Sequence, residues 1–284
     1  MNFDSLGDMM FQYGYDFNKL ILKDSLQKRA NKPQVLAEED KVINEHFTLI
    51  ANRNIDTIMS VGRLLRGHHS IDVSFFTISS ALRGAMLNCL IVLYMATEFE
   101  KIKDSDLSEL EKVEAVKKII YGFNADHILN IRKDYRVLRD MGLPDIDSKE
   151  QEFIDEMNKH HGAYFNKQPL TEISDTKESN LIYRHQKITG RHAASHSKSK
   201  DLALEAFWVY YNYSKVDHTG ILTGAYMDSM IQSPELEFDR IKRAALVMNK
   251  VNHATLNAFQ LVITLDDANL LIGDFNDNLL TSTM

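Results

Sequence analysis

The sequence predicts an all-α fold, built as a single helical-bundle-like domain of about six main helices. Strong helix formers fill the stretches between the four prolines, and all four prolines stand where the apolar pattern breaks. No stretch shows the strict alternation of apolar and polar residues that is typical of strands. We therefore expect helices at 35–66, 71–99, 107–141, 148–164, 199–219 and 235–264.

Residues that start or stop helices set these boundaries. Pro33 precedes the first helix, and Ser70 is a candidate N-cap of the second. Acidic residues at 104–106 precede the third helix, which is expected to stop at the Gly-Leu-Pro sequence at 142–144.

The segments outside these helices divide the chain. Residues 33–265 form the expected helical domain, residues 1–32 an N-terminal appendage, and residues 266–284 a C-terminal tail that docks only in part. Residues 165–198 are polar and predict a long loop, with at most a short helix near 182–188. Loops of this length in compact domains are usually functional or mobile.

Composition sets limits on function and location. The net charge of −7 argues against a broad basic surface for nucleic acid, although it leaves room for a small basic pocket. Cys89 is the single cysteine, so no intrachain disulfide can form and a reducing cytoplasm is the expected location. The first residues, Met-Asn-Phe-Asp-Ser, lack the basic and apolar regions of a secretory signal.

The segment Val73–Thr97 carries one charged side chain, Arg83, among apolar and small polar residues. Its longest strictly apolar run, Cys89–Ala96, is far shorter than the roughly 20 residues that span a membrane, so we expect a buried helix of a soluble protein. A guanidinium cannot lose its proton, so a buried Arg83 needs an anionic or hydrogen-bonding partner. That partner is either a structural carboxylate or a ligand.

A second set of polar residues lies on the helix expected at 199–219. Tyr210, Ser214 and His218 are four residues apart and therefore share one face. A buried face with a phenol, a hydroxyl and an imidazole requires that these groups bond to one another or to something bound. One interpretation is a hydrogen-bonded cluster that fixes helix packing. The other is a pocket that these residues form with Arg83 to bind a small anionic ligand.

The arginine of the apolar helix and the Tyr-x-x-x-Ser-x-x-x-His motif together resemble the motifs of a known protein family. An apolar helix with an arginine, followed more than 100 residues later by Tyr-x-x-x-Ser-x-x-x-His, is similar to a family of uncharacterised bacterial all-helical domains. That family usually shows Arg-Ser-Leu-x-Glu in the early helix. The matching residues here are Arg83, Tyr210, Ser214 and His218, and the resemblance covers roughly residues 40–225. Leu87 stands at the family's glutamate position. The family has no agreed activity to carry over.

Residues 191–196 read Arg-His-Ala-Ala-Ser-His and fit the pattern Arg-x(4–6)-His. This pattern is similar to the signature of HEPN-type ribonucleases, which are compact, often dimeric helical domains of phage-defence and toxin systems that cleave RNA without metal. By this resemblance His196 would move the proton of the 2′-hydroxyl or of the leaving oxygen, and Arg191 would stabilise the charged phosphorane. The spacing is expected to place both on one helical face. The alternative is a solvated basic loop over 184–200.

A combined interpretation joins this basic segment to the turn before residue 70. Arg63, Arg66, His68 and His69 form a basic corner there. If the 184–200 loop folds over that corner, the two would enclose a phosphate-sized pocket.

No metal and no cofactor are expected. No histidine follows a glutamate by three residues, as helical di-iron proteins require, and one cysteine excludes a thiolate zinc site. The chain has neither a P-loop nor a Gly-x-Gly-x-x-Gly sequence.

Three functions therefore stand as hypotheses. The first is a cytoplasmic helical protein that binds a small anionic ligand or a partner through Arg83, Tyr210, Ser214 and His218, without catalysis. The second is a metal-independent ribonuclease, acting on RNA as a homodimer, with Arg191 and His196 as catalytic residues. The third is a scaffold in which both clusters serve packing alone.

Overall fold

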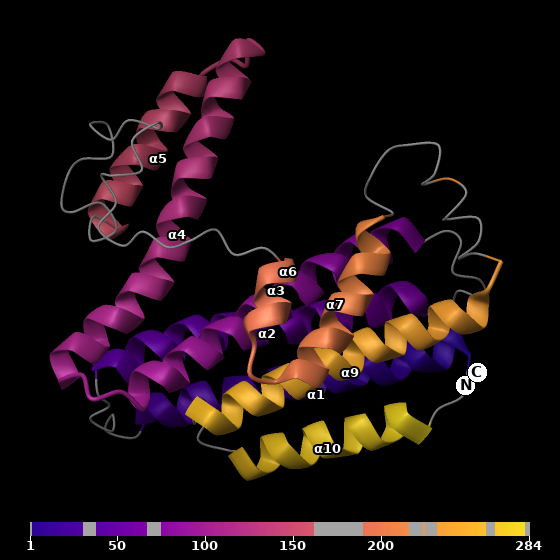
Figure 1. The fold of residues 1–284 in the computed structure, drawn as a ribbon. Helices are drawn as coiled ribbons and strands as arrows, with labels where there is room; N and C mark the ends of the chain where they lie inside the picture. Colours follow the sequence, from indigo (N-terminus) through magenta and orange to yellow (C-terminus); the bar gives the residue numbers. More distant parts are fainter. Residues whose placement is uncertain are drawn as a thin grey trace. The chain divides into compact units, whose positions relative to one another are not determined.

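The structure is a computed structural model that describes residues 2–30, 38–66, 75–161, 190–215, 224, 232–259 and 265–281. Within these ranges all regular secondary structure is helical, which confirms the predicted all-α class. Figure 1 shows the helices in chain order: α1 (Phe3–Ala30), α2 (Glu38–Leu65), α3 (Phe75–Lys103), α4 (Glu109–Asp140), α5 (Ile146–His161), α6 (Gly190–His196), α7 (Lys200–Ser214), α9 (Pro234–Phe259) and α10 (Leu265–Thr281).

The described part of the chain has three helices more than the six main ones expected, namely α1, α6 and α10. The chain also divides into two compact units. One unit comprises Met1–Glu98 together with Ile188–Met284, and the other comprises Phe99–Lys187.

The first helix, α1, is a core element, although its residues lie in the expected N-terminal appendage. Its buried apolar residues are three or four positions apart, which is the pattern of an amphipathic helix. They are Phe3, Leu6, Met10, Tyr13 and Phe17. This face packs along α2 and also contacts α10. The spacing of these apolar residues is thus visible in the sequence, but the expected domain boundary at Pro33 left them outside the helical domain.

Glycines bring the backbones of α1 and α2 into direct contact. A Cβ atom at Gly62 would lie 2.6 Å from the backbone nitrogen of Phe11 and 2.8 Å from the carbonyl oxygen of Gly7. A Cβ atom at Gly7 would lie 2.7 Å from the carbonyl oxygen of Gly62. Neither position has room for a methyl group, so this helix crossing depends on glycine at both.

The interior of the larger unit contains buried amide side chains. Asn54 of α2 donates to Asn252 of α9 at 2.9 Å, and Asn252 donates to the carbonyl oxygen of Ala51 at 3.4 Å. The Cys89 thiol of α3 lies 3.8 Å from the Asn54 carbonyl oxygen. Burial raises the pKa of the Cys89 thiol to about 12, so the group remains protonated at neutral pH. These bonds join three helices through polar groups that would otherwise be costly to bury.

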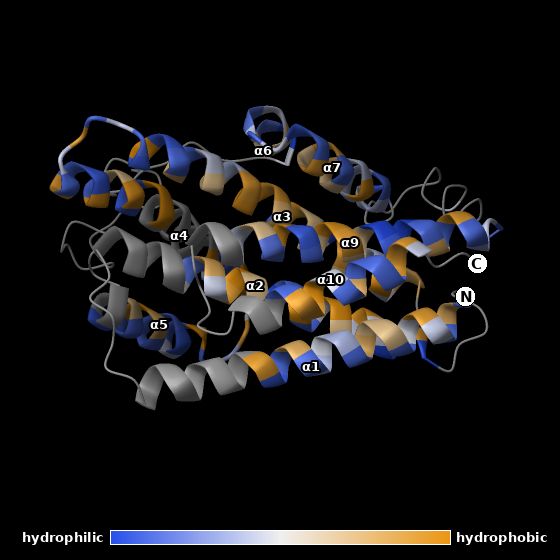
Figure 2. Cartoon of the chain, turned by 90° about the horizontal axis from the view of Figure 1, so that it is seen from below, coloured by the Kyte–Doolittle hydropathy of each residue, from blue (hydrophilic) through white to orange (hydrophobic). Residues whose placement is uncertain are grey.

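The C-terminal helix α10 packs against α9 and α1, although the sequence predicted a tail that docks only in part. Asn249 of α9 donates to the carbonyl oxygen of Ile272 at 3.2 Å and to the side-chain oxygen of Asn276 at 3.0 Å. The Tyr13 hydroxyl donates to Asn249, and the Tyr13 ring stacks on Phe275 with centroids 3.9 Å apart. Figure 2 shows that α10 has both hydrophobic and hydrophilic residues, as a docked surface helix requires.

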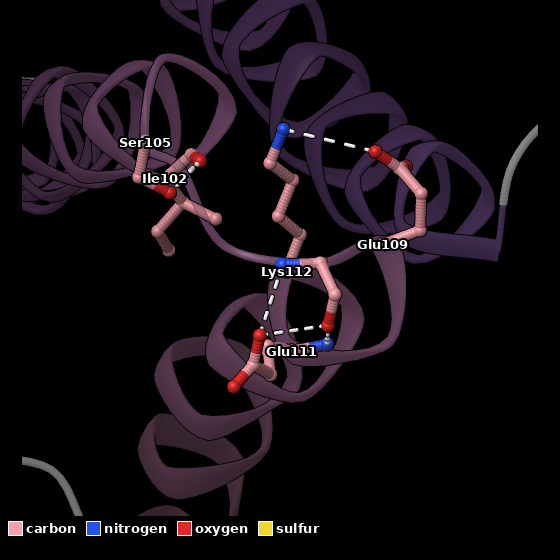
Figure 3. Close-up of polar contacts among 6 residues, drawn as sticks. Ile102, Ser105, Glu109, Glu111 and Lys112 are labelled. Carbon is pink, nitrogen blue, oxygen red and sulfur yellow. Dashed lines mark hydrogen bonds and ion pairs between the residues drawn. The ribbon is translucent and has the colours of Figure 1, made fainter.

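The smaller unit contains the helix pair α4 and α5, which pack against each other. Ser108 caps α4 in a capping box, because its hydroxyl accepts from the Glu111 backbone N–H while the Glu111 carboxylate accepts from the Ser108 backbone N–H at 2.9 Å (Figure 3). At the other end Gly142 adopts a φ of +75°, which ends the helix at the predicted Gly-Leu-Pro turn. Arg139 then pairs with Asp147 of α5 at 2.7 Å.

Among the described residues, α3 is the one helix whose length and apolar composition would allow it to cross a membrane. However, 56 % of its most apolar window is buried inside the protein. The buried core helix of a globular protein has the same apolar composition, and the burial of α3 is typical of such a helix.

Candidate functional site

One stripe of α3 supports both α6 and α7. Its members are spaced three or four residues apart and therefore share one face of the helix. They are Arg83, Leu87, Leu90, Tyr94 and Thr97. Both sequence motifs contact this stripe, so the segments that the sequence predicts as two separate sites are neighbours on one surface of the larger unit.

The contacts along this stripe follow the order of the chain. A Cβ atom at Gly190, the first residue of α6, would lie 3.4 Å from the Leu87 side chain. The ring of His192 meets the ring of Tyr94 edge-on, with centroids 5.4 Å apart. Beyond the end of α6, the backbone N–H of Lys198 donates to the Thr97 hydroxyl at 2.9 Å. Helix α6 is thereby held along α3 at both of its ends.

Arg83 lies at the start of this stripe, beside Tyr210 of α7. Its guanidinium carbon is 5.8 Å from the centroid of the Tyr210 ring, which is within the range of a cation–π contact. Both side chains are partly exposed. The Tyr210 ring also approaches the backbone of Gly190, where a Cβ atom would lie 3.1 Å from the ring. The structure thus brings together two of the four residues predicted for the ligand site, with the cation half-buried rather than enclosed.

Ser214, the third predicted residue, does not join this pair. The Ser214 hydroxyl donates to the carbonyl oxygen of Tyr211 at 2.8 Å, so its hydrogen bond is made within its own helix. His218 lies outside the described residues. Helix α7 ends at Ser214, so the helical spacing expected for the motif is observed from Tyr210 to Ser214 only.

Residues 190–196 form the helix α6, within the segment 165–198 that the sequence predicts as a loop. The short helix expected near 182–188 lies outside the described residues. Arg191 and His196 are both exposed on α6. Residues five apart in an α-helix point about 140° away from each other, so the expectation that both share one helical face is wrong.

The His196 imidazole is oriented by its own helix. Its Nδ1 atom lies 2.9 Å from the carbonyl oxygen of His192 and 2.8 Å from the Ser195 hydroxyl. Because a carbonyl can only accept, Nδ1 carries the hydrogen of this bond, and in the neutral ring Nε2 is the basic nitrogen. The His196 ring also stacks on the His192 ring, with centroids 4.1 Å apart.

A buried carboxyl group at the start of α9 was missed by the sequence analysis. The Tyr213 hydroxyl donates to Glu237 at 2.6 Å, and Arg240 donates to the other Glu237 oxygen at 3.2 Å. Burial raises the pKa of Glu237, against the effects of its two partners. The sequence signal here was misleading, since acidic residues in the first turn of a helix usually lie at the surface and interact with the helix dipole.

The basic corner at the end of α2 engages α1. The Arg66 guanidinium pairs with Asp8 at 2.6 Å, and both Arg63 and Arg66 lie over the Phe11 ring. His68 and His69 fall outside the described residues. Arg66 is therefore already paired with a carboxylate, and the combined phosphate pocket stays a prediction because residues 184–189 of its loop also lie outside the described residues.

Within the described ranges no three His, Cys, Asp or Glu side chains gather as metal ligands do. Comparisons with protein-family models, with curated proteins and with solved structures found no match.

Proposed function

We propose that this protein is a cytoplasmic helical binding protein that takes a small anionic ligand, without catalysis, where α6 and α7 lie on α3. The observation that supports this proposal is the half-buried guanidinium of Arg83 beside the Tyr210 ring. A guanidinium is charged at every physiological pH, and a partly desolvated one attracts an anion more strongly than one in bulk water.

The charge around this pair supports the same interpretation. The stretch 190–200 contains five basic or imidazole side chains and no acidic one, although the whole chain has a net charge of −7. They are Arg191, His192, His196, Lys198 and Lys200. Contacts with α3 hold this stretch at Tyr94 and Thr97, on the stripe that begins with Arg83. A locally positive surface on an acidic protein favours a small anion over a long polyanion.

The proposal is tested by thermal unfolding with inorganic phosphate, nucleoside phosphates and small dicarboxylates. A ligand present at 100 times its dissociation constant stabilises the folded state by about 2.7 kcal/mol, which corresponds to a rise of several degrees. We expect at least one probe to raise the midpoint of the wild type, and Arg83→Gln to abolish that rise. The matched control is Arg136→Gln, at an exposed position on α4, which should respond as the wild type does.

Equal responses of the wild type and Arg83→Gln would remove Arg83 from any binding role. No response of the wild type to any probe would contradict the binding proposal and favour the scaffold hypothesis. Circular dichroism of Arg83→Gln without ligand shows that a lost response does not come from unfolding.

A second candidate function, metal-independent cleavage of RNA, is favoured by the geometry of His196 alone. An exposed imidazole with Nδ1 bonded to a carbonyl presents Nε2 as a base, which is the requirement for taking a 2′-hydroxyl proton. Since α6 directs Arg191 elsewhere, the arginine facing this imidazole would come from a second copy.

The test is cleavage of a single-stranded RNA oligonucleotide in the presence of EDTA. Catalysis by His196 predicts a loss of about 10²–10⁴-fold in rate for His196→Gln, with unchanged cleavage for His253→Gln on α9. Cleavage that is absent in the wild type, or equal in both variants, would eliminate this candidate.

A further inference from the structure

A row of large apolar side chains lies open along α7. Leu204, Trp208 and Tyr211 are 66 %, 42 % and 50 % exposed. Their spacing of four and then three residues places them on one face of the helix. Large apolar side chains that gather in this way, rather than standing singly, are typical of an interaction site.

Cationic side chains adjoin this row. The guanidinium carbons of Arg240 and Arg243 lie 5.9 Å and 5.3 Å from the centroid of the Trp208 ring, and the Lys215 ammonium lies 4.2 Å from that of Tyr211. Trp, Tyr and Arg are the residue types that contribute most to binding energy at protein interfaces. We define the Trp208 face as Leu204, Trp208, Tyr211, Lys215, Arg240 and Arg243.

The outer side of α10 has the opposite charge. Leu270 and Leu280 are 68 % and 60 % exposed, and the exposed Asp274 and Asp277 lie between them. Spacings of four, three and three residues place all four on one side of the helix. The helix contains no Lys or Arg. We define the α10 face as these four residues.

The two faces match in length as well as in charge. The Trp208 face extends along α7 from Leu204 to Lys215, about 16 Å, and the α10 face extends from Leu270 to Leu280, about 15 Å. Each combines leucine with charges that a partner can reach, which are positive at Lys215 and Arg243 and negative on the α10 face, whereas Arg240 pairs with Glu237 within its own chain. The net charge of −7 argues against a nucleic acid as the occupant, whereas a short acidic helix with leucines fits both the cations and the rings.

We propose that a second copy of this chain docks its α10 face on the Trp208 face. The contact joins two different surfaces. Two copies form a closed dimer when the Trp208 face of each one binds the α10 face of the other, which makes two equivalent contacts. Two contacts also double the buried area, toward the roughly 1,200 Å² that specific interfaces require. This inference is independent of the ligand site at Arg83 and Tyr210.

Trp208 provides a direct test, because it is the single tryptophan of the chain. We expect sedimentation velocity of the full chain at low ionic strength to show a monomer–dimer equilibrium. The tryptophan emission should shift to shorter wavelength over the same concentration range, as the ring leaves water. Raising the salt concentration should weaken the dimer, since it screens the charge pairs.

Charge reversal then identifies the two faces. Arg243→Glu alone, or Asp274→Lys with Asp277→Lys, should raise the dimer dissociation constant at least tenfold, and the combination of all three changes should recover most of the loss. The control Asp140→Lys, at an exposed position on α4, should leave the dissociation constant unchanged. A wild type that stays monomeric at every concentration overturns the proposal. So does a dimer that the α10 changes leave intact, or one that the combined variant fails to recover.

Discussion

Replacing Gly62 by alanine is expected to lower the free energy of unfolding by about 1–3 kcal/mol, the usual cost of overpacking. The new methyl group would meet the backbone of α1, at 2.6 Å from the Phe11 nitrogen and 2.8 Å from the Gly7 oxygen. Backbone atoms in a helix cannot move aside individually, so α1 and α2 would have to separate. Urea unfolding followed by circular dichroism measures the loss.

The matched control is Gly84→Ala in α3. Gly84 is exposed, and a Cβ atom there would meet nothing within 4 Å. Alanine is the better helix former, so this variant should be more stable than the wild type by up to about 1 kcal/mol. If Gly62→Ala also stabilised the protein, this would contradict the close contact between the α1 and α2 backbones at Gly62.

His46 is expected to make the protein lose stability as the pH falls. Burial, with a contribution from the charge of Arg53, lowers the pKa of His46 in the folded protein from 6.5 to about 4. Its Nε2 atom is buried and has no hydrogen-bond partner in the described part of the protein. Between pH 6.5 and pH 4 the unfolded chain therefore binds a proton that the folded chain does not, and acid favours unfolding.

This difference in pKa corresponds to about 3 kcal/mol of stability, present above pH 6.5 and lost by pH 4. Urea titrations of the wild type and His46→Gln at pH 7.5 and pH 4 measure it. Other groups titrate over the same range and affect both proteins, so the free energy of unfolding of the wild type is compared with that of the variant at each pH. From pH 7.5 to pH 4 we expect the wild type to lose about 3 kcal/mol more than the variant. A constant difference would show that His46 is accessible to protons in the folded state.

The sequence predicted six of the helices because their apolar spacing and end signals agree. Helix α4 is the clearest example, since its expected end at 142–144 is where Gly142 adopts a positive φ. Helices α1 and α10 have the same apolar spacing, but their position near the chain ends led to the expectation of an appendage and a partly docked tail. The local spacing of apolar residues predicts that both segments are helical, whereas their packing in the core depends on helices far away in the sequence.

The candidate site was predicted less completely. The need of Arg83 for a partner follows from its charge within an apolar segment, and Tyr210 follows from the motif on α7. Ser214 was a poor choice, because a hydroxyl in a helix can bond to a carbonyl of its own helix. The Tyr213–Glu237 bond could not be foreseen, since nothing in the sequence near Glu237 indicates that this carboxylate is buried.

The all-α class, the position of the apolar helix and the presence of one cation within it were predictable from the residues alone, because helix propensity and charge are properties of individual residues and their near neighbours. The pairing of the helices was not predictable in this way and follows from the three-dimensional packing. That packing placed Arg83 beside Tyr210, laid α6 along the α3 stripe and brought the glycines of α1 and α2 into contact. Such contacts depend on the shape and packing of whole helix faces, and residues far apart in the chain form those faces together.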